Sequence, residues 1–183
     1  MKKILTATIG LMLASCATAP TQRAPIAQAP VVVDNPLTQA AERDAAMKFG
    51  STDIRPGDYR MLPAAVIPKS GPVAIVVSLR NQRTYVYKAG QLVAVSTSSH
   101  GVPEHPTDPG HFTILQKEPF HRSNKYSNAP MPFMQRLDHW GRAFHAGVVP
   151  GHPASHGCIR LPAGMAKALY GMTRIGDSVD IEG

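Results

Sequence analysis

Short apolar runs, several alternating with polar residues, dominate the chain from residue 71 onward. They predict β-strands joined by turns, with a meander of three strands followed by three further strands, over residues 73–79, 84–87, 92–96, 110–115, 143–145 and 177–181. Apolar residues at near-helical spacing predict one late helix over 163–172. The fold class expected from these patterns is mainly β with one or two helices, in a single domain.

The first 16 residues have the composition of an export signal. Lys2 and Lys3 precede about 11 mostly apolar residues, too few to cross a bilayer of roughly 30 Å as a helix. Residues 13–16, Leu-Ala-Ser-Cys, resemble a bacterial lipobox, which implies removal of a signal over 1–15 and acylation of Cys16 as a lipid anchor. Ala17 then implies the outer membrane rather than the inner one. The alternative is an ordinary cleavage site with an incidental cysteine.

The next two segments are expected to link the anchor to the folded domain. Residues 16–33 carry Pro20, Pro25 and Pro30 among small and polar residues, which predicts an extended tether reaching on the order of 50 Å. Residues 34–71 begin with a cap-like Asp-Asn-Pro and predict a short helix over 37–49, then a connector rich in proline and glycine. The main folded domain is expected over residues 72–183.

Charge and cysteine content narrow the possible functions. The formal net charge is +7, or about +5 without Lys2 and Lys3, but the basic residues are scattered and form no stripe for nucleic acid. The chain has two cysteines. With Cys16 acylated in an oxidising compartment, Cys158 has no intramolecular partner and is expected to be reactive or paired with another molecule.

Cys158 lies in a run of residues suited to thiol chemistry. A thiol attacks a carbonyl well only as the thiolate, and either His145 or His156 could be the base; the residues alone leave that choice open. Gly157 permits a sharp turn and close approach to backbone N–H groups, so the Gly157 and Cys158 amides are expected to be oxyanion donors. Arg160 can hold a carboxylate bidentately. A zinc site is the competing interpretation, but the two histidines and Cys158 supply three ligands and no fourth is near.

The residues His145-Ala146-Gly147 and the run 155–162, Ser-His-Gly-Cys-Ile-Arg-Leu-Pro, resemble the signature of the L,D-transpeptidase (YkuD-type) catalytic domain of bacterial cell-wall enzymes. Weaker similarities at 73–87, 106–114, 127–133 and 176–179 extend the resemblance over about residues 72–182. It implies a mixed β barrel or sandwich that needs no metal or organic cofactor. Three departures are Asp108 in place of proline, Ala146 in place of glycine or serine, and a short interval between His145 and Ser155.

By this resemblance, Cys158 is the nucleophile and His145 the general base, held by a backbone carbonyl near Ala146. The other residues implied to line the site, position substrate or form the oxyanion pocket are Ala146, Ser155, His156, Gly157 and Arg160. The partner would be a peptidoglycan tetrapeptide stem, cleaved before its terminal D-Ala through a thioester. An amine on another stem, or on a wall-attached protein, would complete cross-linking or attachment in cell-wall organisation and cell shape. The expected location is the periplasm, anchored to the membrane.

Two other functions fit the same residues, and a further segment is expected to form a substrate groove. Water in place of the amine would make the protein an L,D-carboxypeptidase, and loss of the chemistry would leave a non-catalytic peptidoglycan-binding lipoprotein. Residues 119–136 look long and irregular and mix apolar with amide side chains, as in a groove wall or lid. Its expected substrate-groove residues are Tyr126, Asn128, Met131 and Phe133.

Overall fold

The computed structural model describes residues 35–51 and 53–183. The predicted signal, lipid anchor at Cys16 and tether lie outside these residues. The elements follow the chain in the order α1 (Pro36–Phe49), β1 (Tyr59–Met61), β2 (Val73–Ser78), β3 (Arg83–Lys88), β4 (Gln91–Thr97), β5 (Gly110–Thr113), β6 (Gln116–Arg122), β7 (Pro130–Arg136), β8 (Ala143–Ala146), β9 (Ile159–Leu161), α2 (Ala163–Met172) and β10 (Ser178–Glu182). The expectation of a mainly β fold with one or two helices is confirmed.

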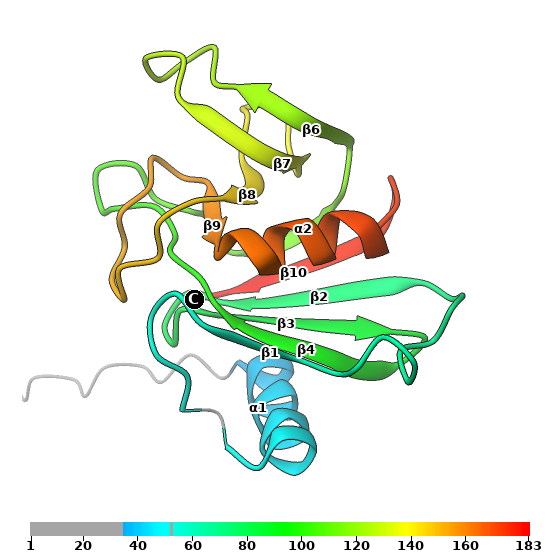
Figure 1. Cartoon of the computed structure of the whole chain (residues 1–183). Helices are drawn as coiled ribbons and strands as arrows, with labels where there is room; N and C mark the ends of the chain where they lie inside the picture. Colours follow the sequence, from blue (N-terminus) through cyan, green and yellow to red (C-terminus); the bar gives the residue numbers. More distant parts are fainter. Residues whose placement is uncertain (1–34, 52) are drawn as a thin grey trace, which may run out of the picture. The chain divides into compact units, whose positions relative to one another are not determined.

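The larger sheet has six strands in the order β1-β4-β3-β2-β10-β5 (Figure 1). The predicted meander is confirmed as the antiparallel strands β2, β3 and β4. The last strand, β10, pairs in parallel with β2 and antiparallel with β5, so the end of the chain closes the sheet around its first predicted strand. Residues 59–61, expected to be part of a connector, instead form β1 at the edge of this sheet.

The smaller sheet has four strands in the order β6-β7-β8-β9. The expectation that residues 119–136 are irregular is wrong, because most of them form the antiparallel hairpin of β6 and β7. Three prolines, at 119, 130 and 132, obscure the strand pattern in the sequence, and proline is tolerated here because β6 is an edge strand and Pro130 begins β7. The strands β8 and β9 pair in parallel.

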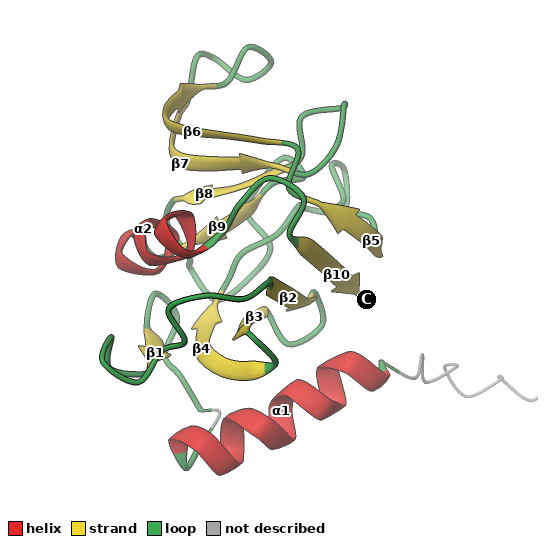
Figure 2. Ribbon diagram, turned by 90° about the vertical axis from the view of Figure 1, so that its right-hand side faces the viewer, coloured by secondary structure: helices red, strands yellow, loops and turns green. Residues whose placement is uncertain are grey.

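One hydrophobic core joins the two sheets and α2. Its members come from the inner face of the larger sheet, from Phe144, Ile159 and Leu161 of the smaller sheet, and from Met165, Ala166 and Leu169 of α2. Figure 2 shows α2 beside β8 and β9, between the small sheet and the large one. Core side chains thus pack against one face of the short strands β8 and β9. This packing fixes the positions of the residues that point to the other face of the two strands.

Helix α1 covers the opposite face of the larger sheet (Figure 2). Its Ala41 and Ala45 are fully buried in a second core with Tyr85, Leu92 and Val95. Proline at the first helical position and the left-handed Gly50 at the end confirm the predicted boundaries of this helix. No helix within residues 35–51 and 53–183 is long and apolar enough to cross a membrane.

The last strand caps the start of α1. Glu182 accepts hydrogen bonds from the Leu37 N–H at 3.2 Å and from the Thr38 N–H at 2.7 Å. These N–H groups have no partner inside the helix, and a carboxylate at a helix N-terminus also complements the helix dipole. We therefore expect Glu182→Ala to lower the free energy of unfolding by about 1 kcal/mol in urea denaturation.

Glu104→Ala is the matched control for this effect. Glu104 is exposed and forms no ion pair among the residues that the structure describes. Its removal is expected to change stability by less than about 0.5 kcal/mol. Equal losses in the two variants would contradict the capping role.

Candidate active site

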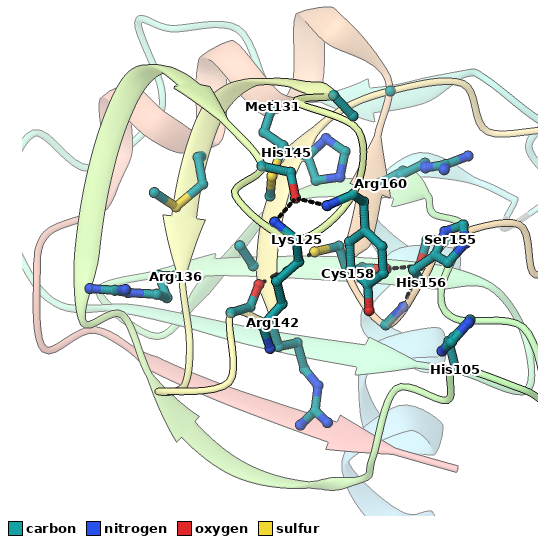
Figure 3. Close-up of a pocket in the computed structure, with 18 of the residues that line it drawn as sticks. His105, Lys125, Met131, Arg136, Arg142, His145, Ser155, His156, Cys158 and Arg160 are labelled. Atoms are coloured by element: carbon teal, nitrogen blue, oxygen red, sulfur yellow. Dashed lines mark hydrogen bonds between the residues drawn. The ribbon is translucent and has the colours of Figure 1, made fainter.

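A cavity of about 590 Å³ opens beside β8 and β9, and its lining includes Cys158, His145, His156 and Arg160, which the sequence singled out. Its walls come from the loop 104–108, the tip of the β6–β7 hairpin, strand β7, the turn before β8, and the segment around Cys158. Figure 3 shows Cys158, His145, His156 and Arg160 gathered in it, with Lys125 from the hairpin tip. Segments more than 50 residues apart in the sequence therefore meet at one site.

The register of β8 and β9 places the thiol and His145 on the cavity side. Phe144 lies opposite Ile159, and both are fully buried in the core. Side chains alternate between the two faces of a strand, so His145 and its partner Arg160 point to the other face, as does Cys158 one step before β9. All three line the cavity.

His145 is held as a neutral imidazole. Its Nδ1 lies 2.9 Å from the Ala146 carbonyl oxygen, which can only accept, so Nδ1 carries the hydrogen and Nε2 keeps a free lone pair. Burial lowers the pKa of His145, opposed by this hydrogen bond and assisted by the nearby positive charge of Arg160. The tautomer needed for proton acceptance is therefore fixed before any ligand binds.

Cys158 rests as a thiol. Burial is the largest influence on its pKa and raises it. A hydrogen bond with the Ala143 backbone lowers that pKa, as do Arg160 and Arg142, while Asp138 raises it. The sulfur lies 3.6 Å from the Gly141 carbonyl oxygen, to which the S–H donates. A raised thiol pKa and a lowered imidazole pKa together favour the neutral pair over a thiolate–imidazolium pair.

The turn before Cys158 is fastened by Ser155. The Ser155 hydroxyl donates to the Cys158 carbonyl at 2.5 Å and accepts from the Gly157 N–H at 3.1 Å. Gly157 has φ +102°, which favours glycine. The Gly157 N–H is thus engaged by Ser155, and the expectation that the Gly157 and Cys158 N–H groups are oxyanion donors stays a prediction. Ser155 is itself buried and shapes the turn, although it reaches the cavity lining.

His156 belongs to a cluster of three rings. Its ring centroid lies 4.7 Å from that of Tyr126 at the hairpin tip and 4.8 Å from that of His105. His105 was not among the residues expected from the sequence, since nothing in its neighbourhood signals a role. The two histidines that the sequence could not distinguish thus have different surroundings. His145 is hydrogen-bonded to the Ala146 carbonyl, and the ring of His156 lies against Tyr126 at the tip of the β6–β7 hairpin.

Arg160 lies against the backbone at Gly147. A Cβ atom on Gly147 would lie 3.0 Å from Arg160 Cδ, so glycine allows this close approach. Among residues 35–51 and 53–183, Arg160 has no acidic side chain within ion-pair distance. An unpaired guanidinium is therefore available at the cavity wall.

Two of the four groove residues expected from the sequence line the cavity, and two do not. Tyr126 and Met131 line it. Phe133 packs instead against the core and Tyr170, because its left-handed backbone, φ +58°, interrupts the alternation that would have placed it beside Met131. Asn128, also left-handed, is exposed in the tip turn, where its carbonyl accepts from Arg122. The expectation for Phe133 and Asn128 is therefore corrected.

The turn between β7 and β8 supplies cavity residues that the sequence did not single out. Arg142 bonds Asp108 at 2.6 Å and lies 3.5 Å from Asp138, and all three line the cavity. Across the opening, Lys125 donates to the Trp140 carbonyl at 2.5 Å. Asp108 departs from the family pattern, and its ion pair with Arg142 explains how an acid is accommodated at this position.

No group of three or more histidine, cysteine, aspartate or glutamate side chains within the described part of the chain is arranged to hold a metal ion. The cavity lining brings together the Cys158 thiol, the His145 imidazole, three guanidinium groups, one ammonium group, and the carboxylates of Glu104, Asp108 and Asp138. Such a set can transfer a proton from sulfur to nitrogen and can hold carboxylates.

Comparison with known proteins identifies the family. The model of the YkuD L,D-transpeptidase catalytic domain matches residues 72–181, and the chain belongs to that family. An L,D-transpeptidase from Stackebrandtia nassauensis is 26% identical, with a TM-score of 0.58 over 76% of this chain and 65% of that one. An L,D-transpeptidase from Mycobacterium tuberculosis H37Rv is 25% identical, with a TM-score of 0.58 over 61% of this chain and 58% of that one.

A third structure resembles this chain in fold. It is L,D-transpeptidase 3 from Mycobacterium tuberculosis in complex with a faropenem-derived adduct, 23% identical, with a TM-score of 0.55 over 61% of this chain and 60% of that one. The chain spans less than two thirds of the length of each of these three structures. The comparison with curated protein sequences gives no match. The family and the sandwich-like fold suggested by the sequence are confirmed.

Proposed function

We propose that this protein is a peptidoglycan L,D-transpeptidase in which Cys158 is the nucleophile and His145 the general base. The observation that carries the proposal is the placement of both side chains on the cavity face of paired strands, with His145 Nδ1–H tied to the Ala146 carbonyl. That bond leaves Nε2 as the proton acceptor. Membership of the L,D-transpeptidase family supports the same chemistry.

In the first half of the reaction, the donor stem enters the cavity with its last peptide bond beside the sulfur. The thiol turns from the Gly141 carbonyl and gives its proton to His145 Nε2, while sulfur attacks the carbonyl carbon. The tetrahedral intermediate collapses with cleavage of the C–N bond. The departing D-Ala nitrogen takes the proton from His145, which leaves a thioester on Cys158 and a neutral imidazole.

In the second half, an amine on another stem or on a wall-attached protein attacks the thioester. His145 removes a proton from the attacking nitrogen, the C–S bond breaks, and the sulfur is reprotonated. Water in place of the amine would give carboxypeptidase action by the same steps. No cofactor is required, because nucleophile, base and acyl acceptor complete each step.

Charged groups in the cavity suit an anionic peptide. Arg160 faces the cavity without an acidic partner among the described residues, and Lys125 and Arg136 also lack one. The carboxylates of a peptidoglycan stem could pair with these cations. The proposed location remains the periplasm, with Cys16 as a lipid anchor, more consistent with the outer membrane; that rests on the sequence of residues 1–17.

A carbapenem tests the catalytic proposal. One of the structural relatives holds a faropenem-derived adduct, and a β-lactam carbonyl presents an acyl group to a nucleophile in the same way as the donor stem. We expect incubation of the purified protein with a carbapenem to add one carbapenem mass, localised to Cys158. Intact and peptide mass spectrometry provide the measurement.

Cys158→Ala is expected to show no adduct, while Cys16→Ala keeps it. An unmodified wild-type protein with an intact circular dichroism spectrum would contradict the catalytic proposal. Incubation with purified stems then separates the two acceptors, since new cross-linked dimers indicate transpeptidation and tripeptides alone indicate carboxypeptidase action.

A further inference from the structure

The turn Leu137–Arg142, which joins β7 to β8, lies directly beside the thiol. It is closed by the Leu137 N–H, which donates to the Arg142 carbonyl at 2.8 Å, and by the Arg142 N–H, which donates to Asp138 Oδ1 at 2.9 Å. Between these bonds lies Gly141, whose carbonyl oxygen is 3.6 Å from Cys158 Sγ. The geometry of the turn therefore fixes the position of the Gly141 carbonyl, which accepts the hydrogen bond from the resting thiol.

Asp138 is an unusual residue for such a turn because its side chain is only 6% exposed. Its Oδ2 has no hydrogen-bond partner among the described residues; Arg142 Nη1 lies 3.5 Å away. The Arg142 guanidinium is shared, since its Nη2 bonds Asp108 at 2.6 Å. The Asp138 carboxylate is buried, and its counterion Arg142 also bonds Asp108. Little water therefore screens the electric field of the Asp138 charge, and Arg142 neutralises that charge only in part.

We propose that Asp138 is the positioning residue of the resting thiol: it holds the Gly141 carbonyl against Cys158 Sγ and places a buried negative charge in the wall of the same cavity. Asp138 does not touch the reacting atoms and acts through Gly141 and through its field. In the resting protein the S–H hydrogen points to Gly141 rather than to His145 Nε2. Activation is then the rotation of the thiol from the carbonyl to the imidazole, after which the proton passes to Nε2.

This arrangement has a chemical consequence. The thiolate is the form that reacts with electrophiles and oxidants, so a thiol kept protonated at rest is spared side reactions until a ligand displaces it from the Gly141 carbonyl. The inference depends on Cys158 being the reactive residue of the proposed function. It concerns the state of the sulfur before substrate arrives, which can be measured without peptidoglycan.

Other charged and titratable groups lie around the sulfur. Arg142 and Arg160 oppose the effect of Asp138 on the pKa of Cys158. His145 on β8, His121 and Lys125 of the hairpin, His156 beside the cysteine and Asp108 of the loop 104–108 line the same cavity. The test therefore compares variants in one titration, in which each variant changes one of these groups and keeps the others.

The experiment measures the second-order rate of alkylation of Cys158 by iodoacetamide from pH 5 to 11 in the full-length protein. The rate is read on the peptide that contains Cys158, so Cys16 does not contribute. In Asp138→Asn the amide oxygen still accepts the Arg142 N–H while the charge is gone. We expect the midpoint of the profile to move to lower pH, with an alkylation rate at pH 7 about threefold to tenfold higher.

Arg142→Gln provides a variant with the opposite sign. It removes a positive charge and leaves Asp138 without its partner, so the midpoint is expected to rise and the rate at pH 7 to fall about threefold to tenfold. Asp108→Asn is the matched control, because Asp108 bonds the same guanidinium but is 68% exposed, so water screens its charge. Its profile should lie much closer to that of the wild type.

Asp138→Ala separates the two parts of the role. It is expected to share the lower midpoint of Asp138→Asn and, in addition, to lose the turn hydrogen bond, with a lower melting temperature that the asparagine variant restores. Superimposable profiles of wild type and Asp138→Asn would overturn the proposal, as would a downward shift in Arg142→Gln. Either folded variant alone decides the question, and neither result depends on whether a carbapenem acylates the protein.

Discussion

His145→Gln is expected to slow acylation of Cys158 by a carbapenem by a factor of about 10²–10⁴. The wild-type imidazole has its Nδ1 hydrogen donated to the Ala146 carbonyl at 2.9 Å, so Nε2 accepts the thiol proton as sulfur attacks. Glutamine is close in size and polar, but its amide cannot take up a proton near neutral pH. Stopped-flow or time-resolved mass spectrometry gives the rate of adduct formation.

The control for this variant is alkylation by iodoacetamide above pH 10. At high pH hydroxide takes the thiol proton in place of the imidazole, so wild type and His145→Gln should react at similar rates. A variant that retains alkylation and loses acylation identifies His145 as the base. Acylation within a factor of about three of the wild-type rate would contradict that role, given the size of general-base effects.

The pH dependence of wild-type acylation checks the same assignment. Burial lowers the pKa of His145, so the imidazole stays neutral and able to accept a proton below pH 6.5, its ordinary pKa. The acylation rate should therefore hold steady as the pH falls through 6.5 and decline only at lower pH. A decline that begins above pH 6.5 would indicate a raised pKa and a charged resting imidazole.

The sequence predicted those parts of the fold that depend on local pattern. The runs that became β2, β3, β4, β5, β8 and β10 are rich in β-branched residues or alternate, and α2 has helical spacing. The β6–β7 hairpin was missed because prolines at 119, 130 and 132 resemble loop residues when the edge position of β6 is unknown. The three-residue strands β1 and β9 are too short to produce a pattern.

For the site, the sequence could identify the residues but not their surroundings. Chemistry alone left His145 and His156 equivalent, and only the family resemblance favoured His145. The distinction lies in the tertiary structure, where the ring of His156 meets Tyr126 and His105. No sequence motif includes Asp138. It is buried beside Arg142, whose guanidinium also bonds Asp108, 34 residues before Arg142 in the chain.

Phe144→Ala is expected to cost about 3–5 kcal/mol of unfolding free energy, the largest stability effect we predict. Phe144 is fully buried in the core that joins both sheets and α2, and its ring lies directly beneath the strand that carries His145. Removal of the ring loses buried apolar surface and leaves a void among rigid neighbours. Urea denaturation followed by circular dichroism gives the change in stability, and Phe144→Leu should lose much less.

Phe120→Ala is the matched control, because Phe120 is also a strand phenylalanine but is 86% exposed on the edge strand β6. It should change stability by less than about 0.5 kcal/mol. Phe144→Ala should also slow carbapenem acylation at temperatures where the protein remains folded, since a void below β8 loosens the strand that aligns His145 with the sulfur. A destabilised variant with unchanged acylation would mean that the β8–β9 pairing alone aligns the two side chains.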